Sequence, residues 1–165
     1  MPSSSVDGRV LNGRTNLSIR SLFSAFSVIR GQINAKDTKM AELVYKNESF
    51  AIMGACFEVY KQKGCGFTEP IYQECLQLEF ALRGVPFVAQ PALSLEYKGT
   101  LLEQFFRPDF ICFGNIIVEL KALEKLMDAH RAQSLNYLNA TKFELALLVN
   151  FGHHPKVEYE RIINR

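Results

Sequence analysis

Three residues in the middle of the chain have the types and spacing that suit chemistry on a phosphodiester: Asp109, Glu119 and Lys121. Residues 116–121 read as a β-strand, whose side chains alternate between two faces, so Glu119 and Lys121 are predicted to share one face. A Gly-Asn pair at 114–115 predicts a tight reversal. This reversal places Asp109 on the partner strand, within about a residue or two of Glu119. Two carboxylates and an ammonium group are therefore expected to meet at one patch of a sheet.

Such a patch suits metal-assisted hydrolysis. Asp109 and Glu119, together with the main-chain carbonyl of Leu120, offer the hard oxygen ligands that Mg²⁺ prefers, with Mn²⁺ as a possible substitute. A bound cation would lower the pKa of a water and offset the charge of the scissile phosphate. Lys121 would orient the attacking hydroxide or stabilise the transition state. The alternative is that Glu119 and Lys121 form an ordinary ion pair without a catalytic role. The D-x9-E-x-K spacing alone is weakly specific and does not exclude it.

Polar residues on two predicted helices would complete the site. Glu69 and Tyr72 lie one turn apart on one stripe at the start of the second helix. On the helix after Lys121, His130, Gln133 and Tyr137 follow one stripe. Tyr72, His130 and Tyr137 are expected to line a substrate groove. The alternatives are a first-turn acid that complements the helix dipole for Glu69, a surface or capping role for His130, and ordinary polar packing for Gln133 and Tyr137.

The elements that must position these residues follow from hydrophobic periodicity and turn signals. The predicted elements are helices over 48–63, 69–83 and 123–140, and strands over 87–97, 101–112, 116–121, 143–150 and 157–163. Pro91 and Pro108 interrupt the first two strand regions. On the second helix, the apolar residues that share one side are Ile71, Cys75, Leu78 and Leu82. The order of elements is typical of an α/β or α+β fold, with a mixed central sheet flanked by helices.

Composition indicates a soluble globular protein. Of the 165 residues, 48% are hydrophobic and 22% are charged, which suits one domain with a real core. No apolar run approaches the roughly 20 residues that span a bilayer, so no membrane association is expected. The four cysteines match no zinc-binding spacing. We therefore expect free thiols and a cytoplasmic location.

Charge and composition divide the chain in two. Residues 1–39 are basic, whereas residues 40–165 are slightly acidic, although the net charge is only +2. The start of the chain has no periodicity, and the spacing of apolar residues over Leu17–Arg30 predicts a short amphipathic helix. We interpret residues 1–39 as a flexible extension or a misassigned start before Met40, with an organellar targeting peptide as a weaker alternative. Because residues 40–165 are not broadly basic, nucleic-acid binding would require a local positive groove or metal ions.

Several ordered motifs carry a resemblance to a known family. The four segments are Gly66–Tyr72 (GFTEPIY), Ile117–Leu126 (IVELKALEKL), His130–Leu138 (HRAQSLNYL) and Leu147–Gly152 (LLVNFG). Together they resemble the GxxExxY protein family, which is placed within the PD-(D/E)xK nuclease superfamily. The resemblance covers about residues 42–164. One departure is Cys65, where members often have proline, and this change affects a loop only.

The resemblance implies a restriction-endonuclease-like core and a metal-dependent nuclease that acts on DNA or RNA. By position, Asp109 corresponds to the metal-binding aspartate, and Glu119 and Lys121 correspond to the (D/E)xK pair. Glu69 corresponds to the additional helix carboxylate, which the resemblance implies is a further metal ligand. Gln133 corresponds to the polar residue of the following helix, which the resemblance places among the catalytic residues. The alternatives are a non-catalytic module that retains the fold and binds nucleic acid or protein, and an interaction domain with a solvated acidic face. A homodimer or protein partner is a further possibility.

Overall fold

The computed structural model describes residues 44–164 of the chain. The predictions made for residues 1–39 (flexible extension, misassigned start, targeting peptide and short amphipathic helix) lie outside this range. In chain order the elements are α2 (Lys46–Lys63), α3 (Glu69–Arg83), β1 (Phe87–Ala89), β2 (Leu93–Tyr97), β3 (Thr100–Phe106), β4 (Phe110–Cys112), β5 (Ile116–Lys121), α4 (Asp128–Thr141), β6 (Leu145–Asn150) and β7 (Glu158–Ile163). No helix in this range is long and apolar enough to cross a bilayer.

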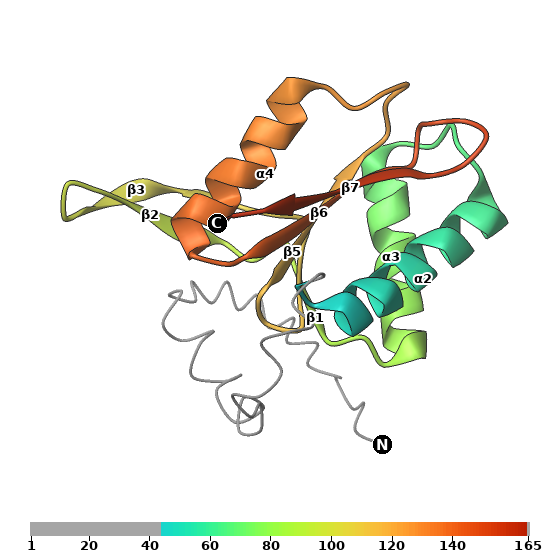
Figure 1. Ribbon diagram of the computed structural model, residues 1–165, viewed down its shortest axis with the longest axis horizontal. Helices are drawn as coiled ribbons and strands as arrows, with labels where there is room; N and C mark the ends of the chain where they lie inside the picture. Colours follow the sequence, from blue (N-terminus) through green and yellow to red (C-terminus); the bar gives the residue numbers. More distant parts are fainter. Residues whose placement is uncertain (1–43, 165) are drawn as a thin grey trace, which may run out of the picture.

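The predicted mixed α/β architecture is confirmed. A five-stranded sheet has the order β1-β4-β5-β6-β7. Its central pair, β5 and β6, is parallel, and the other pairs are antiparallel. Strands β2 and β3 form a separate two-stranded hairpin. Helices α2 and α3 cover one face of the sheet and α4 covers the other (Figure 1). Parallel pairing needs a crossover, which α4 supplies between β5 and β6.

Strand β5 is buried on both faces, and its alternation decides where the charged residues lie. Ile116, Val118 and Leu120 belong to the core formed with α2 and α3. Ile117 belongs to a second core, which includes Leu138 of α4. Because side chains alternate, Glu119 shares the face of Ile117, on the α4 side of the sheet.

Helix α3 buries a different stripe from the one that its aliphatic residues mark. Tyr72, Leu76 and Phe80 are fully buried, whereas Leu78 and Leu82 are exposed. Aromatic contacts explain this preference, because they anchor both ends of the buried stripe. The ring centroids of Tyr72 and Phe151 are 4.6 Å apart, and those of Phe80 and Phe110 are 5.3 Å apart. Large aromatic rings bury more apolar area than the aliphatic side chains on the opposite side of α3.

Helix α4 begins at Asp128, five residues later than predicted. The chain between β5 and α4 is instead a loop whose backbone N–H groups donate to side chains of other elements. The three bonds are Ala122 N–H to Glu69 Oε1 (3.3 Å), Leu123 N–H to Asn150 Oδ1 (2.9 Å) and Leu126 N–H to Glu158 Oε2 (3.2 Å). These side-chain acceptors replace the helical carbonyls that the N–H groups would otherwise need.

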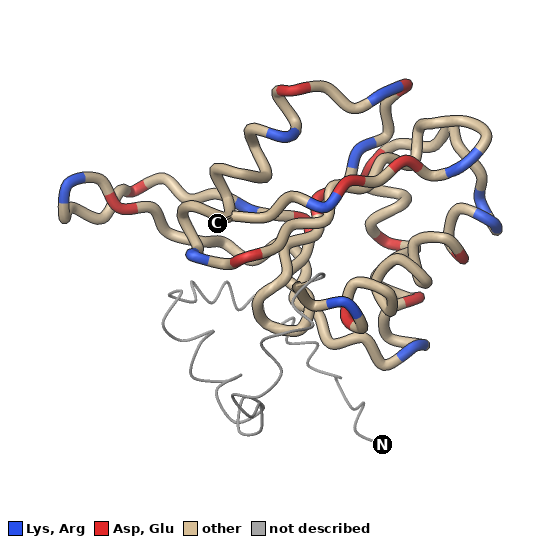
Figure 2. The backbone as a smooth tube through the Cα atoms, in the orientation of Figure 1, with Lys and Arg blue, Asp and Glu red and all other residues tan. Residues whose placement is uncertain are grey.

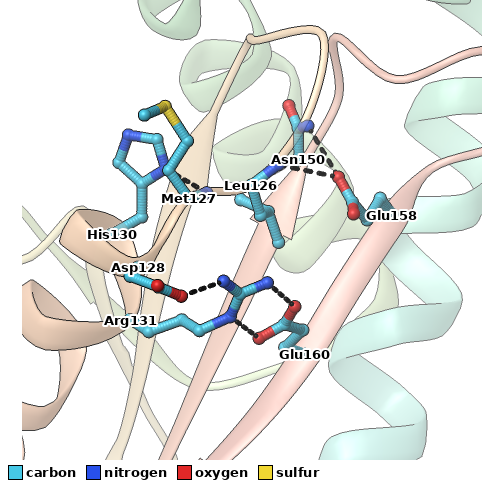
Figure 3. Close-up of polar contacts among 8 residues, drawn as sticks. All are labelled: Leu126, Met127, Asp128, His130, Arg131, Asn150, Glu158 and Glu160. Atoms are coloured by element: carbon cyan, nitrogen blue, oxygen red, sulfur yellow. Dashed lines mark hydrogen bonds and ion pairs between the residues drawn. The ribbon is translucent and has the colours of Figure 1, made fainter.

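Strand β7 is tied to the start of α4 by an arginine (Figure 3). The Arg131 guanidinium donates to Glu160 on β7 at 2.6 and 2.8 Å and to Asp128 at 2.7 Å. These contacts raise the pKa of Arg131 through the two carboxylates, so it stays charged. The ion pair thereby holds the helix against the sheet edge opposite β1.

Candidate active site

Asp109 and Glu119 lie side by side at the open end of the β4–β5 pair. The antiparallel register pairs Phe110 with Val118, so the next pair outward is Asp109 with Glu119. The Leu120 N–H donates to Asp109 Oδ2 at 2.7 Å. The aspartate side chain thus accepts the Leu120 N–H just beyond the last backbone pair of β4 and β5. Pro108, on the β4 side, has no N–H with which to continue the pairing. The predicted convergence of Asp109 with Glu119 is present in the structure.

Glu119 and Lys121 form a buried ion pair. Lys121 Nζ lies 3.0 Å from Glu119 Oε1, and the two residues are 9% and 4% exposed. The other carboxylate oxygen, Glu119 Oε2, is buried and receives no hydrogen bond from residues 44–164. An unpaired charged oxygen in this setting is costly, so the site is electrostatically incomplete.

Burial perturbs the titration of all three groups. The pKa of Glu119 is raised to about 7, chiefly by desolvation and also by the neighbouring Asp109, whereas Lys121 opposes the shift. Desolvation also raises the pKa of Asp109, although the Leu120 N–H opposes it. For Lys121, burial favours the neutral amine, but the contacts with Glu119 and the charges of Glu69 and Asp109 together outweigh it and raise the pKa. The site therefore carries a surplus of negative charge that a cation would relieve.

Glu69 reaches the same site from the first residue of α3. Its Oε1 accepts a hydrogen bond from the N–H of Ala122, the residue that follows Lys121, at 3.3 Å. Its charge raises the pKa of both Asp109 and Lys121. Glu69 therefore does more than complement a helix dipole, because it links α3 to the end of β5.

Gln133 and Tyr137 approach the site from α4. Gln133 Nε2 donates to the Tyr137 hydroxyl at 3.0 Å. Burial raises the pKa of Tyr137, and the charges of Glu119 and Asp109 act in the same direction. The structure thus brings these two predicted residues to the wall of the site that Glu119 faces.

The family comparison agrees with this geometry. A family model for the PD-(D/E)XK nuclease superfamily matches residues 46–162. This chain belongs to that superfamily. Among solved structures, the crystal structure of SSO0001 is similar at 16% sequence identity, with a TM-score of 0.44 over 94% of this chain and 71% of that chain. No curated protein sequence matches this chain.

Nucleases of this superfamily generally depend on a divalent metal, and the residues present fit such an ion. Asp109 and Glu119 supply hard oxygen atoms, and Glu119 Oε2 has no competing hydrogen bond. Within residues 44–164, no three His, Cys, Asp or Glu side chains form a ready-made metal cage. A Mg²⁺ site needs no such cage, because this ion keeps several waters and uses one or two carboxylates.

Two residues expected to bind substrate make contacts within the fold. Tyr72 is fully buried, and its hydroxyl donates to Gly64 O at 2.8 Å and accepts from Phe67 N–H at 3.2 Å. It therefore anchors the loop before α3 and has no exposed group for a ligand. His130 Nδ1 accepts from Met127 N–H at 3.0 Å, which caps the start of α4 (Figure 3). This contact is the capping role that the sequence offered as the alternative for His130.

Asn150 and Glu158 support the site, although the sequence interpretation gave them no role. Asn150 ends β6 directly beside Lys121 in the parallel register and is fully buried. Its Oδ1 accepts from Leu123 N–H and Gly152 N–H, and its Nδ2 donates to Glu158 Oε2 at 3.0 Å (Figure 3). An asparagine at the end of an apolar strand was the sequence signal that could have identified Asn150. A buried amide needs hydrogen-bond partners, so it predicts contacts with neighbouring segments.

Proposed function

We propose that this protein is a metal-dependent nuclease that hydrolyses phosphodiester bonds of DNA or RNA, and that it is a GxxExxY-type member of its superfamily. The observation that carries the proposal is the cross-strand pair Asp109–Glu119, with Lys121 at 3.0 Å and one glutamate oxygen unbonded. A buried acidic pair with one lysine is a poor way to stabilise a fold. It is a good way to bind a cation next to a phosphate.

The metal ligands in this proposal are Asp109, Glu119, Glu69 and the main-chain carbonyl of Leu120. The carbonyl belongs to this set because the N–H and C=O of one strand residue point to the same side, and the Leu120 N–H points to Asp109. Bound Mg²⁺, or Mn²⁺ in its place, supplies Lewis acidity that lowers the pKa of a water and offsets phosphate charge.

Lys121 has two tasks in this proposal. Its ammonium holds Glu119 in one orientation through the 3.0 Å contact. It also orients the attacking hydroxide and stabilises charge in the transition state. Gln133 and Tyr137, bonded to each other, contact the substrate from α4.

The GxxExxY assignment is supported by what its three motif residues do. Gly66 has φ +110°, a conformation that favours glycine. Glu69 accepts from the Ala122 N–H next to Lys121. Tyr72 holds the loop that carries Gly66. The motif thus fixes the chain that delivers Glu69 to the site.

A non-catalytic nucleic-acid- or protein-binding module is the second candidate. In that case Asp109 and Lys121 would contribute to the local fold only, and their loss would leave ligand binding unchanged.

Cleavage assays with the full chain separate the two candidates. Single-stranded, duplex and branched DNA, and RNA, are incubated with Mg²⁺ or Mn²⁺ and the wild type, Asp109→Asn, Lys121→Ala or the control Glu124→Gln, which alters an exposed carboxylate. The nuclease proposal expects cleavage by wild type and control, and a loss of about 100-fold or more in the other two. Binding without cleavage in all four proteins would support the module instead.

A further inference from the structure

We propose that the β2–β3 hairpin binds an unpaired strand of the nucleic-acid substrate, with the Tyr97 ring stacking on a base, an inference that rests on the proposed nuclease function. Strands β2 and β3 pair only with each other within residues 44–164 and project away from the five-stranded sheet (Figure 1). A lone two-stranded hairpin is marginally stable in water, so large apolar side chains exposed on it need a reason. Tyr97 is 63% exposed at its tip.

The register divides the hairpin into two faces. Leu93 pairs with Phe106 and Tyr97 pairs with Thr100, on either side of a register shift between Ser94 and Glu96. Both strands have an even number of steps between the two pairs, so side-chain alternation assigns these four residues to one face, which we call inner. The outer face carries the pairs Ser94–Phe105 and Glu96–Leu101. Lys98 and Gly99, both with positive φ, form the two-residue turn between the strands.

The inner face is continuous with the candidate active site. At the base of the hairpin, Leu93 is buried in the core that contains Ile117 of β5. The Phe106 ring lies against Tyr137, with 4.7 Å between ring centroids. Tyr137 is hydrogen-bonded to Gln133 at the wall of the site. Three residues after Phe106 the chain reaches Asp109. A strand held along the inner face would therefore lead to Asp109 and Glu119.

A cation accompanies the exposed aromatic ring at the tip of the hairpin. The Lys98 ammonium lies 5.4 Å from the centre of the Tyr97 ring, so a cation accompanies the exposed aromatic group. Glu96 is on the outer face, opposite Leu101. Glu103 lies in the stretch of β3 that the register leaves unpaired. Figure 2 shows a basic tip, with the acidic positions further along the hairpin.

This chemistry selects unpaired bases over an intact duplex. An exposed tyrosine ring gains a stacking partner only from a base that is not already stacked and paired, and a nearby lysine binds the adjoining phosphate. Single-stranded segments, flaps and branch points present such bases. We therefore assign a substrate with an unpaired strand next to the scissile bond, and Tyr97 as a specificity-determining residue.

The test compares Tyr97→Ala with the matched control Leu101→Ala, which removes a similarly exposed side chain from the outer face of the same hairpin. Full-length proteins are assayed with Mg²⁺ on a blunt duplex and on the same duplex with a single-stranded flap. Binding to a fluorescein-labelled oligothymidylate of about 20 nucleotides is measured by anisotropy in EDTA. We expect Tyr97→Ala to lose about five- to a hundredfold in oligothymidylate affinity and in flap preference. Leu101→Ala should match the wild type.

The outcomes distinguish this inference from the proposed function. If the wild type cleaves DNA but the two variants behave alike, the hairpin assignment is overturned and the nuclease stands. If the wild type binds and Tyr97→Ala alone loses binding, but no protein cleaves, the hairpin assignment stands and the nuclease is overturned. Absence of both binding and cleavage overturns both. A wild-type dimer that Tyr97→Ala dissociates in sedimentation would identify the hairpin as a contact between copies, against the inference.

Discussion

Glu119 accepts an ion-pair contact from Lys121 at 3.0 Å through one carboxylate oxygen, while its second oxygen is buried without a hydrogen-bond donor from residues 44–164. Only one of the two Glu119 carboxylate oxygens therefore has a partner. Complete burial of a charge without full pairing lowers the stability of a fold. A site that tolerates this cost in the metal-free protein gains most when a cation binds.

Metal-free stability is expected to decline as the pH rises from about 4.5 to about 7. Burial raises the pKa of Glu119 from 4.5 to about 7 in the folded state, so in this window the folded protein binds more protons than the unfolded chain. Stability then falls with pH, and the loss is complete above about 7. Its size is on the order of 1–3 kcal/mol.

Denaturant titrations in EDTA across this window measure the effect. Glu119→Gln, which cannot titrate, is the control and should show a smaller decline. Added Mg²⁺ should restore stability in the wild type at pH 8 and much less in Glu119→Gln. Parallel pH profiles for the two proteins would contradict the prediction.

Gly152→Ala is expected to destabilise the protein and to impair the site together. A Cβ atom at Gly152 would fall 2.5 Å from the carbonyl carbon of Ala122 and against the backbone of Leu123. Backbone cannot move aside as a flexible side chain does, so the loop after Lys121 must shift, at a cost of about 1–3 kcal/mol. Thermal unfolding and cleavage rate measure the two effects.

Gly54→Ala is the matched control. Gly54 lies inside α2, and a Cβ atom there would be 3.6 Å from the Arg83 side chain, an ordinary contact. Alanine favours a helix over glycine by about 0.5–1 kcal/mol, so this variant should be unchanged or more stable and keep its activity. Similar losses in both variants would show that the close approach at Gly152 is unimportant.

Asn150→Asp is expected to weaken the link between β6 and β7. Asn150 Nδ2 donates to Glu158 Oε2 at 3.0 Å, and an aspartate would place two carboxylates at that contact. The variant should lose about 1–3 kcal/mol of stability at neutral pH. The aspartate still offers an acceptor to Leu123 N–H, but repulsion from Glu158 displaces it, so cleavage should fall as the loop after Lys121 loosens.

Adding Glu158→Gln to Asn150→Asp should restore much of this loss. Glutamine removes one of the two facing charges, and its amide can donate to the new carboxylate. A double-mutant cycle measures the coupling. Additive losses in the double variant would rule out the direct contact as the cause.

Local patterns identified most of the elements because their signals are strong. The apolar run of β6 is typical of a strand buried on both faces, and Lys98-Gly99 forms the predicted turn. The start of α4 was misplaced because its competing hydrogen bonds come from residues distant in sequence. Glu69 and Asn150 accept the N–H groups of Ala122 and Leu123, and no local pattern reports such partners.

The sequence by itself determined the hairpin that places Asp109 beside Glu119 and Lys121, because alternation and turn length set the register of neighbouring strands. It also determined that Glu69 begins a helix. Only the tertiary structure decided that α3 brings Glu69 to the end of β5, that Tyr72 is buried, and that Tyr97 lies on the hairpin face continuous with Phe106. The physical reason is that helical or strand periodicity specifies which side chains share a face, whereas packing between elements specifies what that face meets.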